Sequence, residues 1–396
     1  MRRGHIPELD GVRGLACLLV IFLHVVIAPL PLSPGSWFDL ARFRIQPFLI
    51  GGVDLFFILS GFLIAGILMD SRSSPNYFRS FWLARASRIF PVYYLMIAFS
   101  LVMNWVNANY PSVTAHLVGH ATLSIWYYVA FVQNFALALL PGGRASLGVT
   151  WSLAIEEQFY LVLPFLVLLF RRRALVALAI GIILATPVIR AWVVQSVNWN
   201  AGYIITVCRL DALMMGFLVA CIVRHDRSLD LARRAQWSLN WLAVFLIVLQ
   251  LADFWGAVGQ ILERSGNSTV ALVLICAQYP LINLAMACLL LNVFTREAGP
   301  LRWVFKTKIL MTAGLVSYGA YMYHQVVNNA LWGLLYGTGP SFKGWHHIYM
   351  PVLVLMITAV ISWLSLRYFE MPVRRWAKER RAIDRASIGT MAAERG

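Results

Sequence analysis

The chain has 396 residues, of which 60% are hydrophobic and only 13% are charged. A soluble globular domain carries about 25% charged residues, so this composition excludes an ordinary soluble protein and predicts a chain that lies in a lipid bilayer. The formal net charge of +16 comes from Lys and Arg residues between long apolar runs, which is typical of a membrane protein and leaves no basic face for nucleic acid.

Ten apolar runs are long enough to cross a bilayer as helices, a crossing that takes about 20 residues. They lie near residues 14–32, 47–69, 89–106, 149–170, 174–194, 201–223, 238–259, 268–294, 308–337 and 346–370. An eleventh run, near 121–140, is richer in polar and aromatic residues and ends at Pro141, Gly142 and Gly143. We therefore predict an all-α, polytopic membrane helix bundle of about ten transmembrane helices.

The basic residues orient these ten spans. Arg171, Arg172 and Arg173 follow the fourth span, and a cytoplasmic N-terminus places them in the cytoplasm, as the positive-inside rule requires. An eleventh full span would move them outside. Both termini are therefore predicted to be cytoplasmic, with a re-entrant or interfacial helix near 121–140. The five cysteines lie in apolar runs without a Cys-x-x-Cys spacing, which indicates neither a disulfide nor a metal site.

The first span carries Arg13 at its inner end and His24 near its middle. They are 11 positions apart, so at roughly 100° and 1.5 Å per residue they share a helix face, about 16 Å apart. An ionisable side chain inside a membrane is costly unless it faces protein or water, so His24 is a functional candidate. Alternatively, His24 bonds to a neighbouring helix and Arg13 only follows the positive-inside rule.

Further ionisable residues share the outer half of the membrane with His24. They are Asp54, Glu156, Glu157, Arg209 and Asp211. Unpaired charges at this depth would be very unfavourable, whereas charges paired around a polar cavity would suit an active site. Glu156 and Glu157 are adjacent and point about 100° apart, so only one is expected to face the cavity. In a structural alternative, Arg209 neutralises a carboxylate and holds helices together.

Arg85 and Arg88 are three positions apart at the cytoplasmic end of the third span. They would share one face of a helix, and a pair of guanidinium groups suits phosphate. The positive-inside rule alone also predicts arginines at this place.

Six motifs, in a fixed order, resemble those of the membrane acyltransferase-3 family, which acylates sugars on bacterial surface glycans. They are residues 7–14 (PELDGVRG), 52–62 (GVDLFFILSGF), 85–91 (RASRIFP), 151–160 (WSLAIEEQFY), 317–324 (SYGAYMYH) and 368–372 (YFEMP). The resemblance runs from about residue 7 to residue 375. Each motif alone is a weak pattern, but six in this order are specific.

The resemblance implies an acyl-CoA-dependent O-acyltransferase. Such an enzyme would move an acyl group, with acetyl favoured, from cytoplasmic acyl-CoA to a hydroxyl of a surface glycan or a lipid-linked sugar. His24 and Arg13 would be essential, and Arg85 and Arg88 would bind the donor. Acyl-CoA would be a co-substrate, with no permanently bound cofactor.

The resemblance and the short polar stretch after the last predicted span together predict the domain organisation. Residues 1–375 would form the membrane acyltransferase domain and residues 376–396 a polar, disordered cytoplasmic tail. We expect a single-module member without the SGNH-hydrolase-like domain that some relatives carry, located in the bacterial inner membrane among its lipids. Tyr318 and His324 belong to a closing motif and would be acceptor-site or structural residues.

His24 is the predicted general base, because its intrinsic pKa suits proton transfer near neutral pH. Asp54 and Glu156 are the other catalytic candidates, since either carboxylate would fix the tautomer of His24, as in a hydrolytic triad. Direct attack on the thioester and a transient acyl-imidazole both fit.

Two rival functions share these features. A transporter or flippase for a glycan or lipid-linked substrate would also carry ten spans and intramembrane charges. The ordered motifs and the absence of an inverted repeat favour the enzyme. An acyltransferase with a lipid or small-molecule acceptor also fits the motifs.

Overall fold

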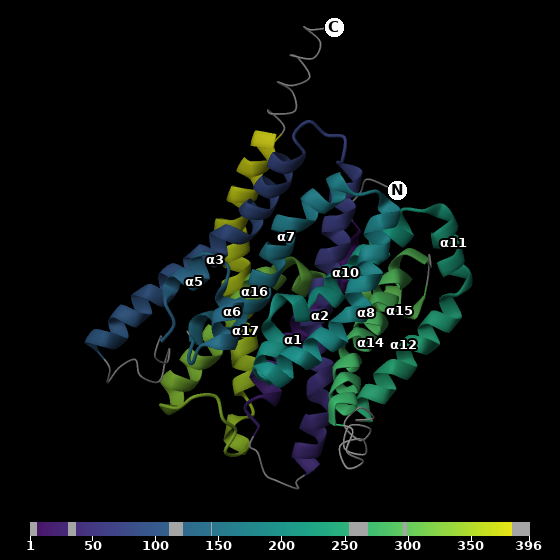
Figure 1. Ribbon diagram of the computed structural model, residues 1–396. Helices are drawn as coiled ribbons and strands as arrows, with labels where there is room; N and C mark the ends of the chain where they lie inside the picture. The colour runs from purple at the N-terminus through teal and green to yellow at the C-terminus, as the bar shows by residue number, and fades with distance from the viewer. Residues whose placement is uncertain are drawn as a thin grey trace.

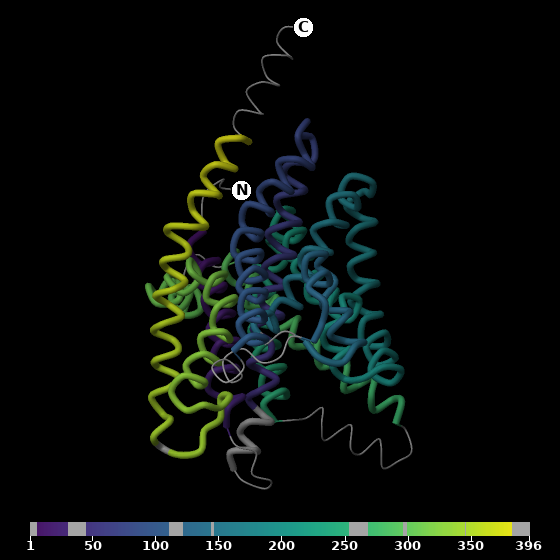
Figure 2. Tube along the Cα trace, turned by 90° about the vertical axis from the view of Figure 1, so that its left-hand side faces the viewer, coloured from purple at the N-terminus to yellow at the C-terminus, as the bar shows by residue number. Residues whose placement is uncertain are grey.

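The computed structural model describes residues 6–30, 37–110, 122–143, 145–252, 268–295 and 299–381. Every regular element in this part of the chain is a helix, which confirms the all-α prediction. The long helices run side by side as one bundle (Figures 1 and 2).

The elements follow in chain order. They are α1 (Pro7–Phe22), the π-helix η1 (Leu23–Ile27), α2 (Trp37–Asp70), α3 (Tyr77–Asn109), α5 (Ile125–Val129), α6 (Gln133–Leu139), η2 (Ala145–Thr150), α7 (Trp151–Leu169), α8 (Arg172–Ser196), α9 (Trp199–Ile204), η3 (Thr206–Cys208), α10 (Leu210–Val223), α11 (Asp226–Arg234), α12 (Gln236–Leu251), α14 (Ser268–Thr295), α15 (Pro300–Phe305), α16 (Lys308–Tyr336), η4 (Trp345–His347), α17 (Met350–Ser365) and the π-helix η5 (Leu366–Glu370).

Seven helical segments within the described residues are long and apolar enough to cross a membrane. They are Pro7–Ile27, Ile45–Asp70, Tyr77–Asn109, Ser146–Leu169, Arg172–Ser196, Ser268–Thr295 and Met350–Arg381. The predicted span 201–223 is divided into α9, η3 and α10, and α10 is shorter than a crossing helix. α12 covers the first part of the predicted span 238–259, whose residues 253–259 lie outside the described residues. α16 matches the predicted span 308–337 but is not among the seven segments. The protein is thus an integral membrane helix bundle, and the count of ten spans stays a prediction.

Residues 125–139 form two short helices and not one span. α5 has five residues and α6 has seven, well short of the about 20 that a crossing takes. Gln133 of α6 is fully buried and donates to the Thr150 carbonyl oxygen at 2.8 Å. The segment therefore packs into the bundle as two short helices, and its re-entrant or interfacial placement in the membrane stays a prediction.

The start of α1 and the end of the last helix lie at the same end of the bundle (Figures 1 and 2). That last helix continues from α17 and η5 to Arg381. Residues 376–381 of the predicted tail are therefore helical, and residues 382–396 lie outside the described residues. An even number of crossings places both termini on one side, and their cytoplasmic location stays a prediction.

Cysteine labelling tests this orientation. In a variant without the five native cysteines, Leu140→Cys should react with a membrane-impermeant reagent in intact cells, whereas Ala174→Cys should react only in opened cells. Leu140 follows α6 and Ala174 lies in the first turn of α8, and both are exposed. Labelling of Ala174→Cys in intact cells would mean that the region 121–140 crosses the membrane, contrary to the ten-span topology.

Glycines let the central helices pack with their backbones in direct contact. A Cβ on Gly61 of α2 would lie 2.0 Å from the Leu213 carbonyl oxygen of α10. A Cβ on Gly314 of α16 would lie 1.9 Å from the Asp10 carbonyl oxygen of α1. Since both distances are far inside van der Waals contact, only glycine fits. These close contacts fix α1 against α16 and α2 against α10.

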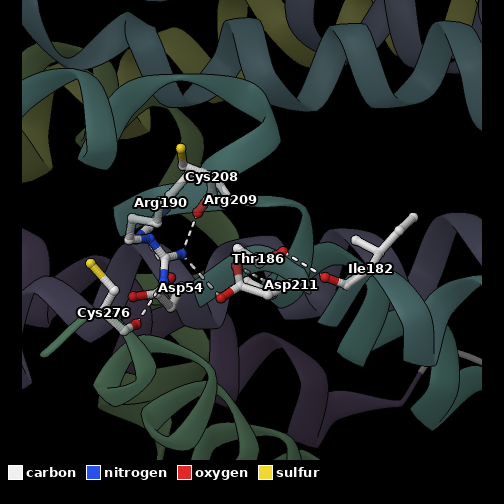
Figure 3. A network of polar contacts seen from close by, with 9 residues as sticks. Asp54, Ile182, Thr186, Arg190, Cys208, Arg209, Asp211 and Cys276 are labelled. Carbon is white, nitrogen blue, oxygen red and sulfur yellow. Dashed lines mark hydrogen bonds and ion pairs between the residues drawn. The ribbon is translucent and has the colours of Figure 1, made fainter. Parts of the chain in front are cut away.

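Two buried ion pairs join α2, α8 and α10 (Figure 3). Arg209, the residue before α10, donates to Asp54 of α2 at 2.5 Å. Arg190 of α8 lies 3.1 Å from Asp211 of α10, and all four side chains are buried. Because each charge has a partner of opposite sign, the bundle tolerates four ionisable side chains. The arrangement matches the structural alternative for Arg209.

Arg190 also satisfies two backbone carbonyl groups (Figure 3). Its Nη1 donates to the Cys276 carbonyl oxygen at 3.0 Å, and its Nη2 donates to the Cys208 carbonyl oxygen. Pro280 lies four residues after Cys276 within α14 and has no N–H, so it cannot pair with that carbonyl. Cys208 ends η3, just before α10 begins. Arg190 thus supplies hydrogen bonds that lipid cannot supply.

Arg190→Met is expected to destabilise the bundle by about 3–5 kcal/mol, because it leaves Asp211 as an uncompensated buried charge. Thermal unfolding of the purified protein in detergent measures the loss. The double variant Arg190→Met/Asp211→Asn should recover part of it, and Arg173→Met, at an exposed position, should change little. An unchanged melting temperature in Arg190→Met would contradict a stabilising role for the network.

Candidate active site

One polar cavity of about 90 Å³ lies among α1, α2, α3, α7 and α16. Its charged lining residues are Arg13, Arg85, Arg88 and Glu156. Its other polar lining residues are Ser60, Ser152, Tyr160, Ser317, Tyr318 and Tyr321. These residues come from five of the six sequence motifs, so segments far apart in the chain meet at this cavity.

Three guanidinium groups converge on the cavity. Arg13 of α1 pairs with Asp10, one turn earlier, at 3.1 Å. Across the described ranges neither Arg85 nor Arg88 forms an ion pair, and the Nε of Arg85 is buried without a hydrogen-bond partner. The cavity therefore has an excess of positive charge and an unused donor, which suits an anionic group such as phosphate.

Glu156 is the acidic residue of the cavity wall. Its carboxylate accepts hydrogen bonds from Ser60 Oγ at 2.6 Å and from the Tyr160 hydroxyl at 3.0 Å. The neighbouring Glu157 does not line the cavity, and its Oε1 is buried without a hydrogen-bond partner. One of the two adjacent carboxylates thus faces the cavity, as their angular separation predicts.

His24 lies next to a second histidine, His324 of α16. Nδ1 of His24 is 3.0 Å from Nε2 of His324, and the ring centroids are 5.1 Å apart. His24 belongs to the π-helix η1, a conformation that is rare and frequent at functional sites. His24 is partly exposed and His324 is fully buried.

Tyr321 joins the cavity to the histidine pair. It lines the cavity, and its ring centroid lies 5.9 Å from that of His324. Its hydroxyl lies 2.7 Å from Ser152 Oγ and donates to the Val149 carbonyl oxygen at 3.2 Å. The arginine-lined cavity and the imidazoles are therefore in contact through one side chain.

The structure divides the predicted site residues into groups. Arg13, Arg85, Arg88, Glu156 and Tyr318 line the cavity, His24 and His324 form the adjacent pair, and Asp54, Arg209 and Asp211 lie in the ion network. The Tyr318 hydroxyl donates to the Ile89 carbonyl oxygen of α3 at 2.6 Å. This bond ties α16 to α3, so the structural role expected for Tyr318 has a definite contact.

Neither carboxylate that was expected to fix the His24 tautomer contacts its ring. Asp54 is bound to Arg209, and Glu156 is bound to Ser60 and Tyr160. Within the described residues the side-chain partner of the His24 ring is His324. The expectation was wrong because a buried carboxylate pairs preferentially with a guanidinium or several hydroxyl donors, and depth alone cannot show which partner lies nearest.

Sequence reasoning missed several polar cavity residues. Ser60, Tyr160 and Tyr321 all lie inside the motifs, and Tyr160 comes four residues after Glu156 on the same helix face. This four-residue spacing could have identified Tyr160 as a neighbour of Glu156 from the sequence.

Comparison with known proteins places this arrangement in a family. The sequence model of a protein family, the acyltransferase domain, matches residues 6–367. The peptidoglycan O-acetyltransferase OatA of Listeria monocytogenes is 27% identical over 393 residues, which cover 94% of this chain and 56% of the relative. The putative peptidoglycan O-acetyltransferase YrhL of Bacillus subtilis is 29% identical over 396 residues, which cover 93% of this chain and 55% of the relative. The O-acetyltransferase OatA of Staphylococcus aureus is 23% identical over 390 residues, which cover 94% of this chain and 57% of the relative.

Fold and site together define an integral membrane protein with a cationic internal cavity. The chain belongs to the membrane acyltransferase-3 family. It spans about half the length of the curated relatives it matches. No solved structure gives a significant match.

Proposed function

We propose that this chain is a membrane O-acyltransferase that moves an acyl group from cytoplasmic acyl-CoA to a hydroxyl of a surface glycan or lipid-linked sugar. The observation that carries the proposal is a cavity with three guanidinium groups beside a histidine pair. The reaction needs a site that binds the anionic donor, which the guanidinium groups suit, and a base, which a histidine suits. The three relatives are named O-acetyltransferases, which supports acetyl as the group transferred.

In this proposal Arg13, Arg85 and Arg88 bind the phosphates of CoA. Arg13 lies six positions after the start of α1 and Arg85 eight positions after the start of α3, so they are about 9 Å and about 12 Å from those helix ends. Both helices start at the end of the bundle where the described chain begins and ends (Figure 1). His24 lies about 25 Å from the start of α1, so the thioester would reach inward from the phosphates.

The proposed reaction needs a base at the acceptor hydroxyl. His24 takes the hydroxyl proton while the sugar oxygen attacks the thioester carbonyl carbon; the C–S bond breaks, and the CoA thiolate leaves and takes up a proton. A positioned base of this kind contributes about 10²–10⁴-fold to the rate. In the alternative with a transient acyl-imidazole, a ring nitrogen of His24 attacks the thioester first, and the C–S bond breaks with release of the CoA thiolate. The sugar hydroxyl then takes the acyl group and loses its proton, and the C–N bond to the imidazole breaks.

Peptidoglycan is the first acceptor to test, because two of the relatives are named for it. In this proposal the enzyme lies in the bacterial inner membrane, where acyl-CoA is available on one side and glycan on the other.

Mass spectrometry of cell-surface glycans tests the proposed function. Strains with the gene should carry O-acylated sugars that are missing from deletion strains and from strains with the His24→Ala variant. A deletion that reduces the amount of surface glycan without changing its acylation would favour a transporter or flippase instead.

A further inference from the structure

The hydrogen positions of the histidine pair follow from its surroundings. Nδ1 of His324 lies 2.8 Å from the Tyr321 carbonyl oxygen and 3.2 Å from that of Ala320. A carbonyl oxygen only accepts hydrogen bonds, so Nδ1 of His324 carries a hydrogen and donates it.

His324 is most stable as a neutral ring in this position. It is fully buried, and in the described part of the chain no carboxylate contacts either histidine ring. A buried imidazolium without a counter-ion would be strongly unfavourable. With Nδ1 protonated, a neutral His324 has a bare Nε2 that can only accept.

The direction of the bond between the rings is then determined. Since Nε2 of His324 accepts, Nδ1 of His24 must donate across the 3.0 Å contact. A neutral His24 with its hydrogen on Nδ1 has a free lone pair on Nε2.

We infer that His324 is a positioning residue that holds His24 in the Nδ1–H tautomer and so leaves Nε2 of His24 as the base. A carboxylate does this in hydrolytic triads; here a neutral imidazole does it without burying a charge. The catalytic consequence rests on the proposed transferase function, whereas the tautomer itself does not.

Main-chain contacts hold His24 in place beside His324. Asn328 of α16, one turn after His324, donates to the His24 carbonyl oxygen at 3.4 Å. The π-helix η1 and the glycine contact between α1 and α16 hold His24 against this face of α16. α16 therefore contacts both the ring and the main chain of His24.

Nitrogen-15 solid-state NMR of the full-length protein, labelled at histidine and reconstituted in lipid, tests the tautomer directly. The His24 signals are identified by their loss in His24→Gln. We expect His24 to show a protonated Nδ1 and a bare Nε2. A His24 ring with its hydrogen on Nε2, or with both nitrogens protonated, would overturn the inference.

Variants test the positioning role. His324→Gln keeps an acceptor oxygen for the Nδ1–H of His24 and should retain kcat within about threefold, whereas His324→Leu removes the acceptor and should lower kcat at least about tenfold at an unchanged acyl-CoA KM. His225→Leu is the matched control, because His225 is exposed at the turn between α10 and α11. Equal kcat in the Leu and Gln variants at position 324 would contradict the role.

The tautomer of His24 and the proposed transferase function can be refuted separately. An Nδ1–H His24 in a protein without transferase activity would support the tautomer and refute the proposed function. An Nε2–H His24 in an active enzyme would refute the inference and leave the function standing.

Discussion

His24→Ala is expected to abolish acyl transfer while the protein stays inserted and folded. Among the described residues, His24 is the imidazole that contacts His324, and its partly exposed position suits a base. Losing a general base costs about 10²–10⁴-fold in rate. Product formation by the purified protein in proteoliposomes, at equal protein content, measures the effect.

His225→Ala is the matched control, since it removes an exposed histidine that does not line the cavity. It should retain the activity of the unmodified protein. If His24→Ala also keeps activity within a few-fold at equal membrane abundance, His24 has no part in the mechanism.

The double variant Arg85→Gln/Arg88→Gln is expected to weaken use of the donor at least tenfold in kcat/KM. Hydrogen bonds to charged groups contribute about 1.5–3 kcal/mol each, and two such bonds to phosphate would be lost. The acceptor KM should change little, because the acceptor hydroxyl must meet the thioester near His24, deeper in the membrane. Titration of acyl-CoA against the reconstituted variant gives both constants.

Arg79→Gln controls for the loss of positive charge at this end of α3. Arg79 is exposed and does not line the cavity, although it lies only six residues before Arg85. It should leave the donor KM unchanged. A double variant with unmodified donor KM and kcat per inserted molecule would assign Arg85 and Arg88 to membrane topology and leave the CoA site unlocated.

The sequence was sufficient to predict the helices, because an apolar run of about 20 residues has few alternatives to a spanning helix. Each predicted run overlaps at least one helix of the structure, but the run 201–223 is divided among α9, η3 and α10. The short pair α5 and α6 also lies where a non-spanning segment was expected. Two π-helical segments, η1 and η5, were not predicted.

The contents of the site were harder to predict. Helical spacing correctly indicated that one of Glu156 and Glu157 faces the cavity and that Arg85 and Arg88 lie on one side of α3. It could not reveal the partner of His24, because His324 is 300 residues away in the chain. The η1 segment also changes the angle between residues, so an ideal α-helix does not describe His24 relative to Arg13.

The intramembrane charges show the limit of reasoning from depth. Asp54 and His24 were predicted at neighbouring depths, yet Asp54 pairs with Arg209 and contributes to packing of α2 against α10. Arg190 was overlooked, although two sequence features pointed to it. An arginine inside an apolar run needs a buried polar partner, and Pro280 in the middle of another run leaves a carbonyl group that needs a donor.

The most direct test of the central claim uses proteoliposomes with acetyl-CoA that carries an isotope label in the acetyl group. A soluble peptidoglycan fragment is supplied as acceptor, and mass spectrometry locates the label. The account predicts labelled acetyl esters on the sugar with the unmodified protein and none with His24→Ala. Label that remains on CoA or appears only as free acetate, with an intact and inserted protein and an accessible acceptor, would contradict transfer to a peptidoglycan sugar.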